Sequence, residues 1–450
     1  MGSVRKLVRI GSGAGFSGDR LDPAVVLAER GALDYLALEC LGERTVALAQ
    51  LRKRRDPSAG YDPLLERRME LLLPPLKRNA IRLISNFGAA NPLAAGELVV
   101  AIARRLGIPV TVAVVTGDDV LHLLAPDAVA LESGRPLTDY GQLLSANAYL
   151  GIEALLPALR THADVIIAGR VADPSLFVAP IAHHFGWSQD DLERIARATM
   201  VGHLLECGGQ LCGGYFADPG RKDVPGMAQL GFPFADVDAD GHATVSKVEG
   251  SGGLINLATV TEQLLYEVTD PGAYLTPDVT ADFSGAELTT VARDVVRVSG
   301  ARAKGRSPML KVSIGYAAGY LGEGEISYAG TNALARAELA GNIIRERLGS
   351  TFAEMRIDYI GSTSLHGKSF DPTENPYEIR LRVAARAVSA KEAALVGEEV
   401  EALYTNGPAG GGGTRKYVAE QVGIVSTLID RRLVRSRVTL KEWAHEPQTV

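Results

Sequence analysis

Four side chains that could do chemistry stand out in the sequence: Glu39, Asp173, Glu206 and Cys212. Carboxyl groups act as general acids and bases when a buried environment raises their pKa. A cysteine thiolate is a nucleophile, but it needs a positive or hydrogen-bonding neighbour to form. We interpret the three carboxyl groups as candidates for proton transfer. We expect Cys212 to shape the pocket more than to attack a substrate.

Glu206 and Cys212 belong to one dense polar stretch, residues 202–218. Its helix-like apolar run ends at a pair of glycines, and a second pair follows after one polar turn. Paired glycines permit positive φ and a close approach of the backbone to a neighbour or a ligand. If this stretch lines the ligand site, we expect Cys207 to be buried and Cys212 to lie nearer the ligand. A tight helix-to-loop transition with buried cysteines is the alternative, and the residues leave both open.

The elements that must position these residues alternate between strands and helices. Runs rich in β-branched residues, at 81–86, 110–115 and 165–169, are separated by helix-like segments, as is typical of a buried parallel sheet. Polar residues follow the ends of the predicted strands: Asp19, Glu39, Asn86, Asp118, Asp119, Arg170 and Asp173. Ligands of open parallel sheets bind at the carboxyl ends of the strands, so this edge predicts the ligand site. Each of these residues alone would more often be a helix N-cap.

Two glycine-rich loops supply further candidate binding groups. Residues 11–20 follow a strand at 7–10, and their glycine spacing formally matches a dinucleotide fingerprint, although an ordinary ligand-facing turn is favoured. Residues 405–416 contain four successive glycines before two cations, which predicts either an anion-binding nest or a flexible surface loop. We expect Arg170 to pair an anionic group of the ligand. The candidate ligand-binding residues are Gly13, Gly15, Ser17, Asn86, Arg170, Gln210, Gly410, Gly411, Gly412 and Arg415.

The alternation of predicted strands and helices indicates an α/β protein of two domains. Residues 1–250 are expected to form a parallel α/β domain and residues 255–450 an α+β domain. Turn signals make residues 218–253 look like the connection between them. In the second part, strands are expected at 288–291, 295–299, 310–316 and 326–328, with helices at 332–348 and 391–404. We expect the ligand in the cleft between the two domains.

The composition excludes several classes of protein. The net charge is −6 and the pI about 5.8, which argues against general nucleic-acid binding. Three cysteines do not suggest a disulfide framework, so we expect a reducing cytoplasm. Charges interrupt the first ten residues before a signal-peptide core develops, and no apolar run is long enough to span a membrane.

No metal site is expected from the histidines and cysteines. The eight histidines do not form a zinc-protease motif, and no cysteine pair has zinc-site spacing. His203 and Glu206 are three residues apart on one helix face, but no second such pair accompanies them. Carboxylates at the sheet edge could still hold Mg²⁺, which prefers oxygen ligands.

Several motifs together resemble those of the acyclic terpene utilisation (AtuA) family. The motifs are residues 11–19, 38–39, 85–92, 169–173, 203–210 and 407–413, and the resemblance extends over nearly the whole chain. It implies the catabolism of citronellol- and geraniol-like acids as coenzyme A thioesters. The resemblance also implies that longer members carry an extra carboxyl-terminal ferredoxin-like domain, and we expect this chain to stop before it. We therefore expect that a small partner chain could supply its role.

These observations leave three hypotheses for the function. The first is a catabolic enzyme acting on an acyl-CoA or a related carboxylic acid, of lyase or hydratase type. The second is a non-catalytic subunit or scaffold that needs a partner chain. The third is an ATP- or phosphate-dependent enzyme. In each case we expect a homo-oligomer with a small-molecule ligand.

Overall fold

The computed structural model describes residues 7–367 and 376–444 and divides into two compact units. The first unit is Met1–Gly315 with Ile424–Val450, and the second is Tyr316–Gly423. The domain boundary expected near residue 250 therefore falls inside the first unit. The reason is that strands on both sides of that boundary join one sheet.

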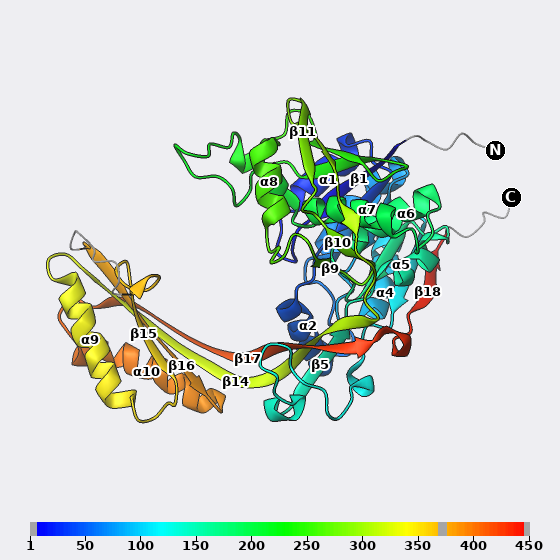
Figure 1. The fold of residues 1–450 in the computed structure, drawn as a ribbon. Helices are drawn as coiled ribbons and strands as arrows, with labels where there is room; N and C mark the ends of the chain where they lie inside the picture. The colour runs from blue at the N-terminus through cyan, green and yellow to red at the C-terminus, as the bar shows by residue number, and fades with distance from the viewer. Residues whose placement is uncertain (1–6, 368–375, 445–450) are drawn as a thin grey trace. The chain divides into compact units, whose positions relative to one another are not determined.

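The first unit is built on a ten-stranded mixed sheet, which confirms the α/β class. The strand order is β11 (Glu287–Ala292), β12 (Val295–Ser299), β8 (Ala243–Lys247), β7 (Pro233–Asp238), β1 (Leu7–Ala14), β2 (Tyr35–Leu38), β3 (Arg82–Ser85), β6 (Val165–Ala168), β4 (Val110–Thr116) and β18 (Arg437–Trp443). The five strands from β1 to β4 in this order are parallel. The strands on either side are antiparallel to their neighbours, including β18, which is drawn in red in Figure 1.

Helices pack against the parallel strands in two sets. One set is α1 (Asp22–Arg30), α3 (Leu65–Arg78) and α4 (Pro92–Leu106), and the other is α5 (Ile152–Leu159), α6 (Ser175–Phe185) and α7 (Leu192–Glu206). The chain reverses its direction along the sheet after β4, so right-handed crossovers place the two sets on opposite faces. The strands that they cover are almost entirely buried and rich in Val, Ile and Leu.

The remaining elements of the first unit surround this sheet. They are α2 (Glu43–Arg55), α8 (Leu257–Leu265), β5 (Leu143–Ala148) and a small sheet of β13 (Arg302–Ala303), β10 (Thr280–Asp282) and β9 (Tyr274–Leu275). Within the described residues, none of the helices has both the length and the apolar character required to cross a bilayer.

The second unit has the order strand, helix, strand, strand, helix, strand. These elements are β14 (Met309–Ala329), α9 (Ala333–Leu348), β15 (Met355–Ile360), β16 (Glu378–Ala387), α10 (Ala390–Asn406) and β17 (Gly412–Asp430), shown in yellow to red in Figure 1. The sheet order is β15-β16-β14-β17, which is the ferredoxin-like arrangement. Both helices pack on this sheet over one buried apolar core, in agreement with the expected α+β character.

Three local expectations differ from the structure. β1 continues through Gly11 and Gly13 to Ala14, so no turn begins at residue 11. Residues 218–253 are not only a connection, because they contain the sheet strands β7 and β8. The strands expected at 310–316 and 326–328 are one strand, β14. Glycines within β14 mark close packing instead of strand ends, since a Cβ at Gly322 would lie 1.9 Å from the Ala393 carbonyl oxygen of α10.

Candidate functional site

A cavity of about 560 Å³ lies at the carboxyl ends of the parallel strands. It is lined by Gly15, Phe16, Asp19, Arg20, Glu39, Leu41, Gly42, Glu43, Asp173, Glu206, Cys207, Gly209, Gln210, Gly214, Tyr215, Met227, Leu230, Phe232, Tyr266 and Glu267. The loops after β1, β2 and β6 contribute to it, together with the end of α7 and the residues after α8. This is the edge at which parallel sheets bind ligands. Every lining residue belongs to the first unit.

Glu39 follows the last residue of β2 and is only 7% exposed. Its Oε1 accepts hydrogen bonds from the Leu41 N–H at 2.7 Å and from Asn86 Nδ2 at 2.8 Å. Asn86 in turn follows β3, so the carboxyl ends of two adjacent strands hold this group. Burial, and then the charge of Asp173, raise the pKa of Glu39 to about 8. Glu39 therefore carries a proton at neutral pH.

Asp173 follows β6 and is held by Arg170. The Arg170 side chain is fully buried: Nη2 donates to the Asp173 carboxylate and Nη1 to the Leu41 carbonyl. Its Nε and Nη2 also donate to the Val171 carbonyl at 2.9 and 2.6 Å. Burial raises the pKa of Asp173, and the guanidinium group opposes that rise. Every nitrogen of Arg170 thus donates to the protein itself, whereas the role expected from the sequence is to pair an anionic group of a ligand.

Glu206 is the last residue of α7, and its side chain is 12% exposed. Its Oε1 lies 2.9 Å from Nδ1 of His203, one helical turn earlier. Burial raises the pKa of Glu206 to about 7, the hydrogen bond to His203 opposes the rise, and Asp173 adds to it. Two carboxyl groups whose pKa values are raised to near neutrality, those of Glu39 and Glu206, thus line one cavity.

The cavity is acidic overall. Its lining contains six carboxyl groups, of Asp19, Glu39, Glu43, Asp173, Glu206 and Glu267, and one cation, Arg20. Glu43, at the start of α2, is firmly ionised. Burial opposes its ionisation, but a 2.6 Å hydrogen bond from the Tyr149 hydroxyl and the nearby Lys311 hold its pKa at about 2.

Two lining residues have a backbone that only glycine adopts readily. Tyr215 has φ of +61° and Glu267 has φ of +60°. Such conformations cost on the order of 1–3 kcal/mol and gather at functional sites. The Tyr215 ring, which is 85% exposed, lies edge-on to the Tyr266 ring at 6.2 Å between centroids. The two aromatic rings form part of the cavity wall.

The structure brings together most of the residues that the sequence singled out at the sheet edge. Glu39, Asp173, Glu206, Gly15 and Gln210 line the cavity, and Asn86 and Arg170 support them. Gly13 lies within β1, where a Cβ would meet the Leu38 side chain at 2.8 Å. The Ser17 carbonyl accepts a hydrogen bond from the buried Arg68, and Ser17 does not line the cavity. Gly410, Gly411, Gly412 and Arg415 belong to the second unit.

The expected arrangement of the two cysteines is wrong. Cys207 lines the cavity, whereas Cys212 is completely buried away from it. The short 3-10 helix Gly208–Cys212 after α7 turns the chain inward, and the Cys212 carbonyl accepts the Leu254 N–H at 3.0 Å. Burial raises the pKa of both thiols, and the charge of Glu206 adds to the rise at Cys207.

We expect Cys207 to be the thiol that reacts in the native protein, and to react slowly because its raised pKa leaves little thiolate. A chromogenic disulfide reagent at pH 8 should modify at most one thiol per chain before unfolding. Cys207→Ser should remove that reaction, and Cys212→Ser should leave it unchanged. Rapid labelling of Cys212 in folded protein would contradict the placement.

Several lining residues escaped sequence reasoning. Glu43 looks like an ordinary acidic residue in the first turn of a helix, which masks any other role. Tyr266 and Glu267 reach the cavity only through the packing of α8 beside the 3-10 helix, which no local pattern reveals. Tyr215 lies in the polar stretch 202–218, so its type and place were visible.

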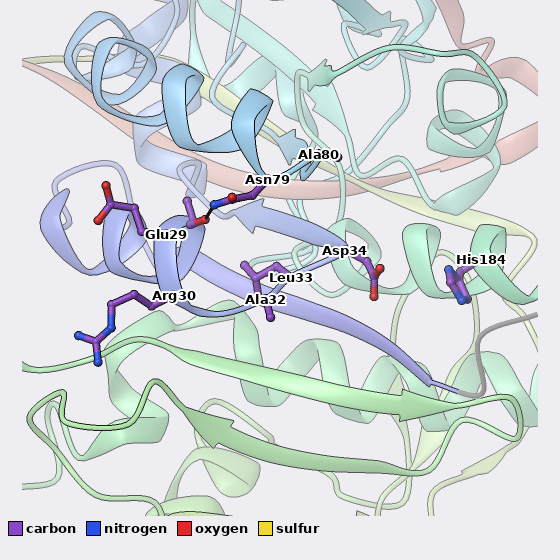
Figure 2. A pocket seen from close by; sticks show the side chains of 9 residues that line it. Glu29, Arg30, Ala32, Leu33, Asp34, Asn79, Ala80 and His184 are labelled. Carbon is purple, nitrogen blue, oxygen red and sulfur yellow. Dashed lines mark hydrogen bonds between the residues drawn. The ribbon is translucent and has the colours of Figure 1, made fainter.

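Within the described part of the chain, no cluster of three or more His, Cys, Asp or Glu side chains has the geometry of a metal site. A second cavity, of about 630 Å³, lies at the amino ends of the parallel strands, where α1 leads into β2 and α3 into β3 (Figure 2). There Asn79 Nδ2 donates to the Ala28 carbonyl at 2.8 Å. None of the candidate catalytic residues lines this cavity, so the candidate site is the one at the carboxyl ends.

Of three comparisons with known proteins, one found a match, and it is a match to a protein family. Neither the comparison with curated proteins nor that with solved structures found a match. The model of the acyclic terpene utilisation family protein AtuA matches residues 8–440. That range includes both units and every residue of the acidic cavity. The chain therefore belongs to the acyclic terpene utilisation AtuA family.

Proposed function

We propose that this protein is a catabolic enzyme that transfers protons on an acyl-CoA thioester with an acyclic, branched chain, as a hydratase or a lyase. One observation carries the proposal: Glu39 and Glu206 line one cavity, and burial raises the pKa of each toward neutrality. Acid/base catalysis is most effective when the pKa lies near the working pH. Membership of the family supports the acyclic, terpene-derived chain.

The two carboxyl groups have complementary roles in such a reaction. Glu39 is the acid, because burial raises its pKa and both of its hydrogen bonds end on Oε1, which leaves the proton on Oε2, and Glu206, held by His203, is the base. In hydration, Glu206 takes a proton from water as the water oxygen bonds to the β-carbon of an unsaturated thioester. The electron pair of the double bond moves to the α-carbon, which takes the proton of Glu39. In a lyase, Glu206 takes the proton of a β-hydroxyl group, the carbon–carbon bond breaks, and Glu39 protonates the departing carbanion.

The acidity of the cavity favours a thioester over a free acid. A neutral thioester carbonyl avoids the repulsion that the ionised carboxyl groups of the lining, Glu43 among them, would impose on the carboxylate of a free acid. The phosphates of coenzyme A would lie outside the cavity for the same reason. The tested probes should therefore include one acid both as its coenzyme A thioester and as the free acid.

The proposal is tested by binding and by proton exchange. A thermal-shift series should compare 3-methyl-2-butenoyl-CoA, the free acid, coenzyme A, nucleotides and Mg²⁺, because a ligand stabilises the state that it binds. We expect the thioester to raise the Tm most. In D₂O, mass spectrometry should detect deuterium at the α-carbon of the bound thioester. Cys212→Ser should keep this exchange, since Cys212 lies outside the cavity.

The other two hypotheses correspond to other outcomes. Stabilisation by nucleotides alone would favour an ATP- or phosphate-dependent enzyme. Stabilisation by a thioester without exchange, together with co-purification of a second polypeptide, would favour a subunit that needs a partner. Absence of any stabilisation by 3-methyl-2-butenoyl-CoA would contradict the proposal.

A further inference from the structure

His203 is buried beside the cavity and is fixed at both ring nitrogens. It is 1% exposed and packs against the rings of Tyr274 and Phe283, with centroids 5.0 and 5.9 Å away. Its Nε2 lies 3.2 Å from the Leu264 carbonyl oxygen, and its Nδ1 lies 2.9 Å from Oε1 of Glu206. His203 does not line the cavity, so it would act only through Glu206.

The two hydrogen bonds determine where the protons lie. A carbonyl oxygen only accepts, so Nε2 must carry a proton to bond Leu264. The second bond, between Nδ1 and Oε1, then also holds one proton. That proton is either on the ring, giving an imidazolium beside a carboxylate, or on Glu206, giving a neutral ring beside a carboxylic acid. The two states differ only by movement of this proton along the 2.9 Å contact.

We propose that His203 and Glu206 share one proton across the Nδ1–Oε1 hydrogen bond and exchange protons with the substrate as a single unit. His203 is the positioning residue of this unit. Glu206 Oε2 is buried and has no hydrogen-bond partner among the described residues, so it is the one acceptor of this pair that the protein leaves unsatisfied. The inference rests on the proposed function for its catalytic consequence, but the proton arrangement itself does not.

The surroundings favour a shared proton over a permanently separated ion pair. The pair lies in the last turn of α7, where the helix dipole favours a cation and disfavours an anion. Asp173 and Glu267 face Glu206 and disfavour its ionisation, and the Cys207 thiol and the Tyr274 hydroxyl lie close by as neutral groups. These influences act against each other, since they stabilise the imidazolium and destabilise the carboxylate. The surroundings alone therefore do not fix the proton on one of the two groups.

The arrangement can be measured without a substrate. Histidine-selective ¹⁵N labelling should show one ring whose Nε2 is protonated and whose Nδ1 signal lies between the values for protonated and unprotonated nitrogen. Glu206→Gln should move that Nδ1 signal to the unprotonated value and leave Nε2 protonated. This change also assigns the signal to His203, and loss of the signal in His203→Gln confirms it. An unprotonated Nε2 would overturn the proposal, and so would an Nδ1 signal that does not change in Glu206→Gln.

The catalytic consequence is tested with His203→Gln, which can still donate to Glu206 but cannot exchange a proton. The rate should then begin to rise at a pH higher by about one unit or more, since His203 lowers the pKa of Glu206. The loss should appear in kcat more than in KM. His183→Gln, on α6 and outside the cavity, is the matched control. An unchanged pH profile would overturn the shared unit, whereas absence of turnover in wild-type protein would instead count against the proposed function.

Discussion

Glu39→Gln should fold normally, become more stable than the wild type as the pH rises, and slow the proposed proton transfer by about 10²- to 10⁴-fold. Both hydrogen bonds to Glu39 end on Oε1, so the proton of the neutral carboxyl group is carried by Oε2. A glutamine keeps the accepting oxygen and places an N–H donor where that proton was. The variant therefore imitates the protonated state and cannot give up its proton as an acid.

The direction of the pH effect follows from the raised pKa. The pKa of Glu39 rises from an ordinary 4.5 to about 8 on folding, so the folded state binds the proton more tightly than the unfolded state. Below pH 4.5 this group therefore does not lower the free energy of unfolding of the wild type. Between pH 4.5 and pH 8 the free energy of unfolding falls progressively as the pH rises. The full loss is on the order of 3–5 kcal/mol. Glutamine does not ionise, so the variant avoids this loss.

The measurement is urea unfolding of both proteins at several pH values between 5 and 9. The difference in the free energy of unfolding should be small at pH 5 and should grow in favour of Glu39→Gln toward pH 9. Glu338→Gln, on the exposed surface of α9, provides a control for the chemical change alone. A difference that stays constant across this range would mean that Glu39 ionises normally in the folded protein.

The edge of the parallel sheet could be predicted because it depends on local pattern and on chirality. β-branched runs identify β3, β4 and β6, and right-handed crossovers bring their carboxyl ends to one edge. A polar residue that directly follows a buried strand must then lie at that edge. For this reason the strand pattern alone predicts that Glu39 and Asp173, far apart in the chain, belong to one site, and both line the cavity.

The rest depends on contacts that leave no local signal. β7 and β8 are short and follow two Pro-Gly turns, so they look like parts of a loop until β1 pairs with β7. The insertion of the second unit is hidden because β14 and β17 each continue from one unit into the other, through glycines that normally interrupt strands. A Cβ at Gly423 would lie 2.1 Å from the Tyr316 ring, so tight packing explains that glycine as well.

The cysteine error has a comparable physical cause. Residues 208–212 form a 3-10 helix, whose tighter winding turns side chains by a different angle from an α-helix or an extended loop. The sequence indicates that the chain turns after α7, but not by how much. A change of one residue in the turn exchanges the side chain that faces the cavity with the side chain that faces the core. Cys207 therefore took the place expected for Cys212.

Arg170→Met should destabilise the protein by about 1–3 kcal/mol, because the fully buried guanidinium group is lost from its buried carbonyl acceptors and from the Asp173 carboxylate, whose side chain is 36% exposed. The variant leaves the Asp173 carboxylate and the Leu41 carbonyl without the donor that Arg170 supplies. It also loses the stacking of the guanidinium group, which lies 4.4 Å from the centroid of the Tyr149 ring. Arg170→Lys should not restore stability, since an ammonium group cannot reach the separate acceptors that the planar guanidinium fork contacts.

A double-mutant cycle tests the cause of that loss. Adding Asp173→Asn to Arg170→Met removes the negative charge that has lost its partner. The double variant should therefore recover part of the lost free energy of unfolding, with a coupling energy of about 0.5–3 kcal/mol. Urea unfolding at pH 7 gives all four free energies, and Arg293→Met, at a side chain that is 95% exposed, is the control. If Arg170→Met cost no more than that control, the buried guanidinium would not be what holds Asp173 in the cavity. If the two losses simply added, the destabilisation would come from lost packing instead of from the charge that Arg170 neutralises.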